Sequence, residues 1–97
     1  MNEKYTFGKL GNKIKYLYLE DTTISIKSGN LALFGDKFLT QDESISIKEI
    51  CNIEITRPMM KSGSMKIITS SGKIVELEIA TIKQYNKANE IKKIILK

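Results

Sequence analysis

The residue types that most often perform catalysis are almost absent from this chain. Among its 97 residues there is no histidine, one cysteine, Cys51, and one arginine, Arg57. Histidine is the usual proton carrier near neutral pH and a frequent metal ligand, so Ser-His-Asp triads, Cys-His pairs and most zinc sites are excluded. We therefore expect a protein that is not an enzyme and that needs no metal or cofactor.

The remaining groups with reactive side chains lack the arrangement that chemistry requires. Glu76 and Glu78 alternate with apolar residues, which predicts a solvent-facing row on one strand instead of an acid-base pair. The glycines at 8–11 and 62–64 do not have the spacing of a phosphate-binding loop. Cys51 alternates with Ile53 and Ile55, which predicts a small core residue with an inert thiol.

The chain is basic, and lysine supplies nearly all of its positive charges. The formal net charge is +5, from 16 basic and 11 acidic residues, and only one of the basic residues is arginine. A sequence-specific nucleic-acid reader would be expected to use more arginine, whose planar fork matches phosphate and guanine. The aromatic residues fall mainly at core-facing or ambiguous positions, so a base-stacking platform is not expected. Nucleic acid is therefore not the expected partner.

Two groups of residues are candidates for a binding site. Arg57 and Lys61 border the segment Pro58-Met59-Met60, which combines soft apolar side chains with cations. Such a tip could dock on a protein partner or dip into an anionic membrane surface. Alternatively, the two methionines fold back over the mouth of the barrel.

The second candidate is a basic cluster. If the strands pair as expected, Lys15, Lys27 and Lys37 converge at one end of the molecule and attract an anion. The alternative is that these lysines are scattered over the surface. No apolar run is long enough for a signal-peptide core or a membrane span, so we expect a cytoplasmic protein, with peripheral membrane contact as an option.

The elements that must position these residues are mostly strands. Apolar and polar residues alternate through most of the chain, which is the period of a half-buried strand. A short apolar run at 31–34 predicts one further strand, and 37–43 fits either a loop or the continuation of a strand. Residues 1–11 are expected to form a loosely ordered arm. The alternating segments are 13–20, 23–27, 44–48, 50–56, 65–69 and 74–79.

The period changes near the end of the chain. Tyr85, Ala88, Ile91 and Ile95 fall within an arc of about 120° at 3.6 residues per turn, which predicts a helix over 81–96 that lays one stripe on a core. The connections before it are too short for parallel crossovers. We therefore expect a single domain over 1–97, mainly β, in which six to seven antiparallel strands form a barrel or sandwich and the helix closes one open end.

Several stretches carry a resemblance to a known family. They are the hairpin at 15–27 with its turn at Gly29, the segment 45–53 with isoleucines at 47, 50 and 53, the strand start at 63–67, and the closing helix with Ala88 and Ile91. Together they resemble the pleckstrin homology-like barrel, in particular the short bacterial pleckstrin homology domains. The resemblance covers most of the chain, from about Gly11 to Leu96.

The resemblance implies a non-catalytic binding or assembly module. Its expected partner is a protein or a second copy of the chain, and the alternative is an anionic membrane or another polyanion bound through basic loops. In eukaryotic relatives a phosphoinositide headgroup lies among basic residues of the loop between the first two strands. Here that loop is assigned to Glu20-Asp21-Thr22, whose two carboxylates would repel a phosphate.

Overall fold

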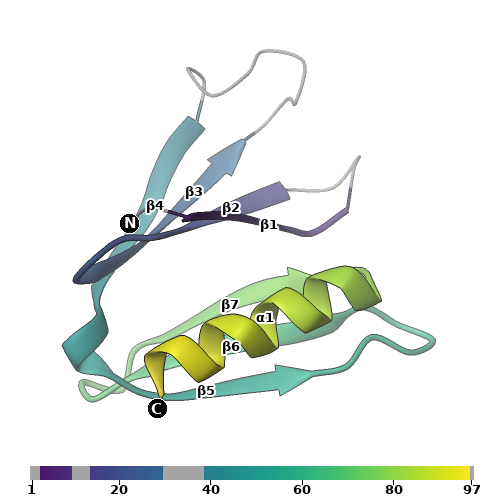
Figure 1. The fold of residues 1–97 in the computed structure, drawn as a ribbon. Coiled ribbons are helices and arrows are strands. Elements are labelled where there is room, and N and C mark those ends of the chain that lie inside the picture. Colours follow the sequence, from purple (N-terminus) through teal and green to yellow (C-terminus); the bar gives the residue numbers. More distant parts are fainter. Residues whose placement is uncertain (1–2, 10–13, 30–38, 97) are drawn as a thin grey trace.

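A computed structural model describes residues 3–9, 14–29 and 39–96 (Figure 1). This part of the chain forms seven strands, one short 3₁₀ helix and one α-helix. The elements are β1 (Glu3–Phe7), β2 (Ile14–Leu19), β3 (Thr23–Gly29), β4 (Leu39–Ser46), η3 (Ile47–Glu49), β5 (Ile50–Thr56), β6 (Gly63–Thr69), β7 (Ile74–Ile79) and α1 (Ile82–Ile95).

The strands form two antiparallel sheets. One sheet has the order β1-β2-β3-β4 and the other β5-β6-β7, so within each sheet the strands pair in the order of the sequence. Figure 1 shows the sheets as separate layers that are linked through η3, with α1 along the layer of β5 to β7. The predicted fold class, a mainly β barrel-like or sandwich arrangement of antiparallel strands with one C-terminal helix, is confirmed.

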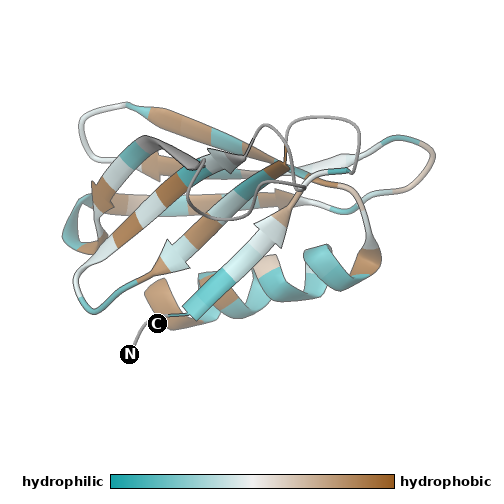
Figure 2. Cartoon of the chain, turned by 90° about the horizontal axis from the view of Figure 1, so that it is seen from above, coloured by the Kyte–Doolittle hydropathy of each residue, from teal (hydrophilic) through white to brown (hydrophobic). Residues whose placement is uncertain are grey.

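The core lies between the inner faces of the sheets and α1. Side chains from both sheets are fully buried there, including Leu17 and Ile24 from one and Ile53 and Ile67 from the other. In β6 buried and partly buried residues alternate without interruption, and Figure 2 shows apolar and polar residues alternating along the strands. Each such apolar side chain stabilises the fold by about 1.5–3 kcal/mol relative to its exposed state.

The helix has the predicted position and inner face. The Thr81 side chain caps it by accepting a hydrogen bond from the Gln84 backbone N–H. Ala88 and Ile91 are buried, while Tyr85 and Ile95 pack against the core from its edge. No helix in the described ranges is long and apolar enough to cross a membrane.

The N-terminal segment differs from the prediction. Residues 3–7, expected in a loose arm, form β1, which pairs with β2 over its full length and buries Tyr5 and Phe7. The alternation of Tyr5 and Phe7 with polar residues has the period and the length of the predicted strands at 23–27 and 65–69, so the sequence carries the same strand signal here. The strand expected at 31–34 lies outside the described residues.

Cys51 is exposed, so its predicted place in the core is wrong. The pairing of β5 with β6 shifts between Ile50 and Asn52, which face Thr69 and Ile68, so Cys51 is the extra residue of a β-bulge. The bulge turns Ile50 into the core in place of Cys51. A bulge shifts by one residue which side chains of the strand face the core. The pattern of apolar residues around Cys51 did not predict this bulge.

The strand predicted at 44–48 is divided between two elements. β4 begins earlier, at Leu39, and ends at Ser46, after which Ile47 begins the 3₁₀ helix η3. The segment 37–43, for which a loop and a strand were both open, is strand from residue 39 onward. Residues 37 and 38 lie outside the described ranges.

Candidate functional site

The loop between β5 and β6 presents two methionines to solvent. Met59 is 87% exposed and Met60 is fully exposed, at 101%. The Met59 N–H donates to the Lys61 carbonyl at 3.0 Å, which closes a tight turn at the end of the loop. The methionines therefore project outward, and the alternative that they fold back over the barrel is wrong. We call residues 57–62 the tip.

The base of the tip is closely packed. A Cβ on Gly63 would lie 2.0 Å from the Thr56 carbonyl oxygen and 2.9 Å from the Pro58 nitrogen, so the two strands approach there as only glycine allows. The Arg57 guanidinium carbon lies 5.9 Å from the centroid of the Tyr85 ring on α1. This cation-π contact connects the base of the tip to the helix.

The structure brings together the four residues that the sequence assigned to the tip. Arg57, Met59, Met60 and Lys61 are all exposed on one short loop. Their neighbourhood follows from sequence spacing alone, because they span five consecutive positions. What the structure adds is their exposure.

Two members of the predicted basic cluster, Lys15 and Lys27, do not come together. Lys27 is the cross-strand partner of Tyr16, whereas Lys15 shares the opposite face of β2 with the buried Leu17. Lys15 and Lys27 therefore project from opposite faces of the sheet and do not converge. Lys37 lies outside the described residues.

The outer face of the first sheet carries two aromatic residues that the sequence placed ambiguously. Tyr16 and Tyr18 are partly exposed on this face. The Lys4 ammonium lies 4.6 Å from the Tyr16 ring centroid, and that of Lys27 lies 4.8 Å from the Tyr18 centroid. Each ring is thus covered by a cation, which is worth about 0.5–1 kcal/mol at an exposed position.

The acidic turn at Glu20 joins β2 to β3, so its assignment to the loop between the first two strands is wrong. The presence of β1 moves every strand number by one. The Glu20 carboxylate forms hydrogen bonds within this turn: its Oε1 accepts from the hydroxyls of Thr23 at 2.9 Å and Ser25 at 3.1 Å. Glu20 therefore stabilises the turn between β2 and β3.

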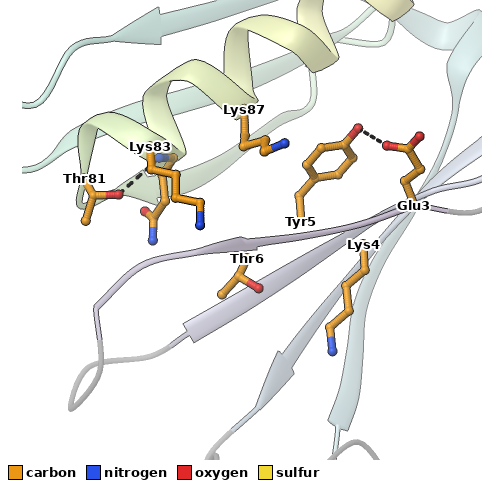
Figure 3. Close-up of a pocket in the computed structure, with 8 residues that line it drawn as sticks. Glu3, Lys4, Tyr5, Thr6, Thr81, Lys83 and Lys87 are labelled. Carbon is orange, nitrogen blue, oxygen red and sulfur yellow. Dashed lines mark hydrogen bonds between the residues drawn. The ribbon is translucent and has the colours of Figure 1, made fainter.

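A groove that sequence reasoning missed lies between β1 and the first two turns of α1, and we call it the β1–α1 groove (Figure 3). Its volume is about 340 Å³. Four consecutive residues of β1 form one wall and the start of the helix forms the other. The lining residues are Glu3, Lys4, Tyr5, Thr6, Thr81, Lys83, Gln84 and Lys87.

Gln84 closes one end of this groove. Its side-chain Oε1 accepts from the backbone N–H of Gly8 at 3.1 Å and of Ala80 at 2.8 Å, and its Nε2 donates to the Gly8 carbonyl at 2.9 Å. One side chain therefore joins the end of β1 to the start of α1. The two joined segments are 76 residues apart in sequence.

Tyr5 supplies a hydroxyl donor at the other side of the groove. The residue is only 6% exposed, and its phenol donates to Glu3 Oε2 at 2.5 Å. Burial raises the pKa of Tyr5 to about 12, and the hydrogen bond to Glu3 and the nearby negative charges of Glu3 and Glu90 act in the same direction. The phenol is therefore protonated at neutral pH and acts as a hydrogen-bond donor.

The remaining charges of the groove are mainly positive. The ammonium groups of Lys83 and Lys87 extend from α1 toward the side of β1 (Figure 3). Lys87 also lies 3.5 Å from the Glu90 carboxylate in an exposed pair on the helix surface. Glu3 is the acidic residue in the wall. No signal in the sequence could have found this site, because Gln84 and the two lysines have the pattern of an ordinary helix surface.

Within 3–9, 14–29 and 39–96, no three histidine, cysteine or carboxylate side chains gather closely enough to hold a metal ion. Comparison with known proteins gives no family: no family model, no curated protein and no solved structure matches the chain significantly.

Proposed function

We propose that this chain is a non-catalytic binding module of the pleckstrin homology-like kind, which acts through protein contacts at the tip and associates with itself or with another protein. The observation that carries the proposal is the exposure of Met59 and Met60, at 87% and 101%. In the described part of the chain, the order of seven antiparallel strands followed by one helix is compatible with the proposed likeness to this family.

Two exposed methionines at one loop end are a suitable anchor for a protein interface. Methionine is unbranched and polarizable, adapts to irregular surfaces, and is enriched in interfaces relative to the rest of the surface. Full burial of one such side chain is worth about 1.5–3 kcal/mol, so two anchors supply a large part of a micromolar affinity. The tightly packed base at Gly63 holds the anchors in one place, which lowers the entropy lost on binding.

Light scattering over a concentration series tests whether the chain associates with itself. We expect the mass of the native chain to rise with concentration, and the Met59→Ser/Met60→Ser variant to remain monomeric at the same concentrations. A native chain that stays strictly monomeric at the highest concentration contradicts self-association. A native chain and a serine variant that associate equally contradict the role of the tip.

A second candidate function is peripheral binding to an anionic membrane. The observation that favours it is that the cations Arg57 and Lys61 flank the exposed methionines on the same loop. In this case the methionines enter the interfacial region while the cations contact lipid headgroups, and binding weakens steeply with salt.

Sedimentation with phosphatidylserine-containing vesicles tests this candidate. Arg57→Glu/Lys61→Glu is expected to abolish vesicle binding. Lys48→Glu/Lys93→Glu changes the net charge by the same amount at exposed positions outside the tip, and it is expected to retain most of the binding. Equal losses in the two variants indicate attraction by net charge alone and contradict a site at the tip.

A further inference from the structure

We propose that the β1–α1 groove binds an extended acidic segment of a partner protein, which adds to β1 as a further strand and places two acidic side chains, two residues apart, against Lys83 and Lys87. This site is separate from the tip and does not depend on the function proposed for the tip. Four observations carry the proposal.

The first observation is the open edge of β1. β1 stands at the end of its sheet and pairs with β2 on one side; no described strand pairs with its other side, although β7 lies in contact with β1. Tyr5 points from β1 toward α1, while Lys4 and Thr6 point away from it (Figure 3); because the groove is lined by both sets, it reaches the strand edge between them. A strand edge of this kind is a template for main-chain hydrogen bonding, and extended peptides bind many domains by adding a strand to it.

The second observation is that Gln84 already occupies one position of such a ladder. A carboxamide offers the same donor and acceptor as a peptide group, and that of Gln84 bonds both the N–H and the carbonyl of Gly8. Gly8 directly follows β1 with a φ of +104°. Because N–H groups two residues apart face the same edge of a strand, we expect the Thr6 N–H at the end of β1 to point the same way as that of Gly8. A bound segment would continue from Thr6 the pairing that Gln84 begins.

The third observation is the size of the groove. Its wall along β1 runs from Glu3 to Thr6, which is about 10 Å at the rise of an antiparallel strand. Its volume of about 340 Å³ is within the range of sites that hold small ligands. The space therefore suits a short extended segment of about four residues.

The fourth observation is that the spacing of Lys83 and Lys87 along α1 is close to the spacing of side chains on one face of a strand. Lys83 and Lys87 are four residues apart on α1, which is about 6 Å along a helix axis. Side chains on the same face of a strand repeat at about 6.8 Å. Two acidic side chains at alternate positions of a bound strand would therefore each face one lysine.

The existing partners of these groups do not block the site. The exposed pair of Lys87 with Glu90 has a separation of 3.5 Å, and pairs of this kind contribute at most about 1 kcal/mol. The Glu3 carboxylate accepts the Tyr5 phenol proton in a hydrogen bond, which partly satisfies it within the wall. The net charge of +5 also speeds the approach of an acidic partner.

A single-stranded nucleic acid is a less suitable occupant. The aromatic ring in the wall, Tyr5, is 6% exposed and presents no face on which a base could stack. A phosphate backbone has no N–H and carbonyl groups in the spacing that a strand edge pairs with. It would use the lysines and leave the β1 edge unpaired.

The test is a titration of the full chain, labelled with ¹⁵N, with an acetylated and amidated heptapeptide in which glutamate and valine alternate. We expect saturable shifts of the amide signals of Thr6, Gln84 and Lys87. Lys83→Glu/Lys87→Glu is expected to weaken binding about tenfold or more, while the control Lys48→Glu/Lys93→Glu, with the same net charge, stays within about twofold. A peptide N-methylated at alternate positions is expected to bind at least about tenfold more weakly, because it cannot complete the ladder.

Four results would overturn the proposal. They are no saturable binding at millimolar peptide, equal weakening by the groove and control variants, undiminished binding of the N-methylated peptide, and tighter binding of an oligothymidylate at the same amides. Signal dispersion in the spectrum shows whether each variant is folded. Lys83→Gln/Lys87→Gln, which removes charge without reversing it, replaces the groove variant if that one unfolds.

Discussion

The tip and the β1–α1 groove are two binding surfaces built in opposite ways. The tip consists of six consecutive residues, and its apolar side chains are exposed because the loop has no neighbour to cover them. The groove consists of two segments 76 residues apart that meet through one side chain, Gln84. The residues of a loop site can therefore be named from local sequence, although their exposure cannot, whereas both the residues and the shape of a site made of a strand edge and a helix depend on the whole fold.

The largest expected effect concerns the base of the tip. Gly63→Ala is expected to destabilise the protein by more than about 3 kcal/mol or to prevent folding, because the new Cβ would lie 2.0 Å from the Thr56 carbonyl oxygen. Urea unfolding measures this. Gly72→Ala is the matched control, since its φ of +92° is strained but no atom lies within 4 Å, so about 1–2 kcal/mol is expected. A loss below 1 kcal/mol at Gly63 contradicts the close approach.

The next effect concerns the closed end of the groove. Gln84→Ala removes three hydrogen bonds to Gly8 and Ala80 and is expected to cost about 1–3 kcal/mol. Gln84→Glu keeps both acceptor contacts but sets an ionised oxygen against the Gly8 carbonyl in place of the Nε2 donor, so it should also lose stability at neutral pH and lose less at acid pH, where the carboxylic acid can donate. Thermal unfolding of the two variants at both pH values measures this. If neither variant is destabilised at neutral pH, the amide does not join β1 to α1 as described.

The middle of the groove is tested by its tyrosine. Since the pKa of Tyr5 is raised from 10.0 to about 12 in the fold, its contribution to stability is complete below pH 10 and is lost as the pH rises from 10 to 12. Ultraviolet titration of the folded chain should show one of the four tyrosines ionising last. Tyr5→Phe should lack that step and lose less stability over the same pH range. Four tyrosines that ionise together near pH 10 in the folded protein contradict the burial of the phenol.

The smallest effect on stability is expected at the end of the tip. Met59→Ser/Met60→Ser should change the free energy of unfolding by less than about 0.5 kcal/mol, because neither side chain packs within the monomer. Chemical denaturation of dilute protein measures this. A loss above 1 kcal/mol would show that the methionines contact the rest of the chain, and the contrast between tip and groove would then disappear.

Cys51 and Tyr5 illustrate where prediction from the sequence fails. Alternation from Ile53 correctly identifies the buried face of β5, but the bulge at Cys51 reverses it. The bulge depends on the pairing with β6, and beside it the Asn52 side chain accepts a hydrogen bond from the Ile53 N–H at 2.9 Å. Tyr5 and Phe7 do alternate with polar residues as in the predicted strands, but it is the pairing of β1 with β2 and the packing on the core that make this segment a strand instead of the expected arm. The groove could not be predicted, because it needs β1 to be in place beside α1.

The sequence by itself determined the fold class, the inner face of the helix, the composition of the tip and the lack of histidine chemistry. These depend on residue type and on periods of two or 3.6 residues, which are local properties of the chain. The tertiary structure alone decided which methionines are exposed, that Lys15 and Lys27 lie on opposite faces, and that Gln84 joins β1 to α1. Those are contacts between distant segments, and their existence depends on how the two sheets and the helix pack together.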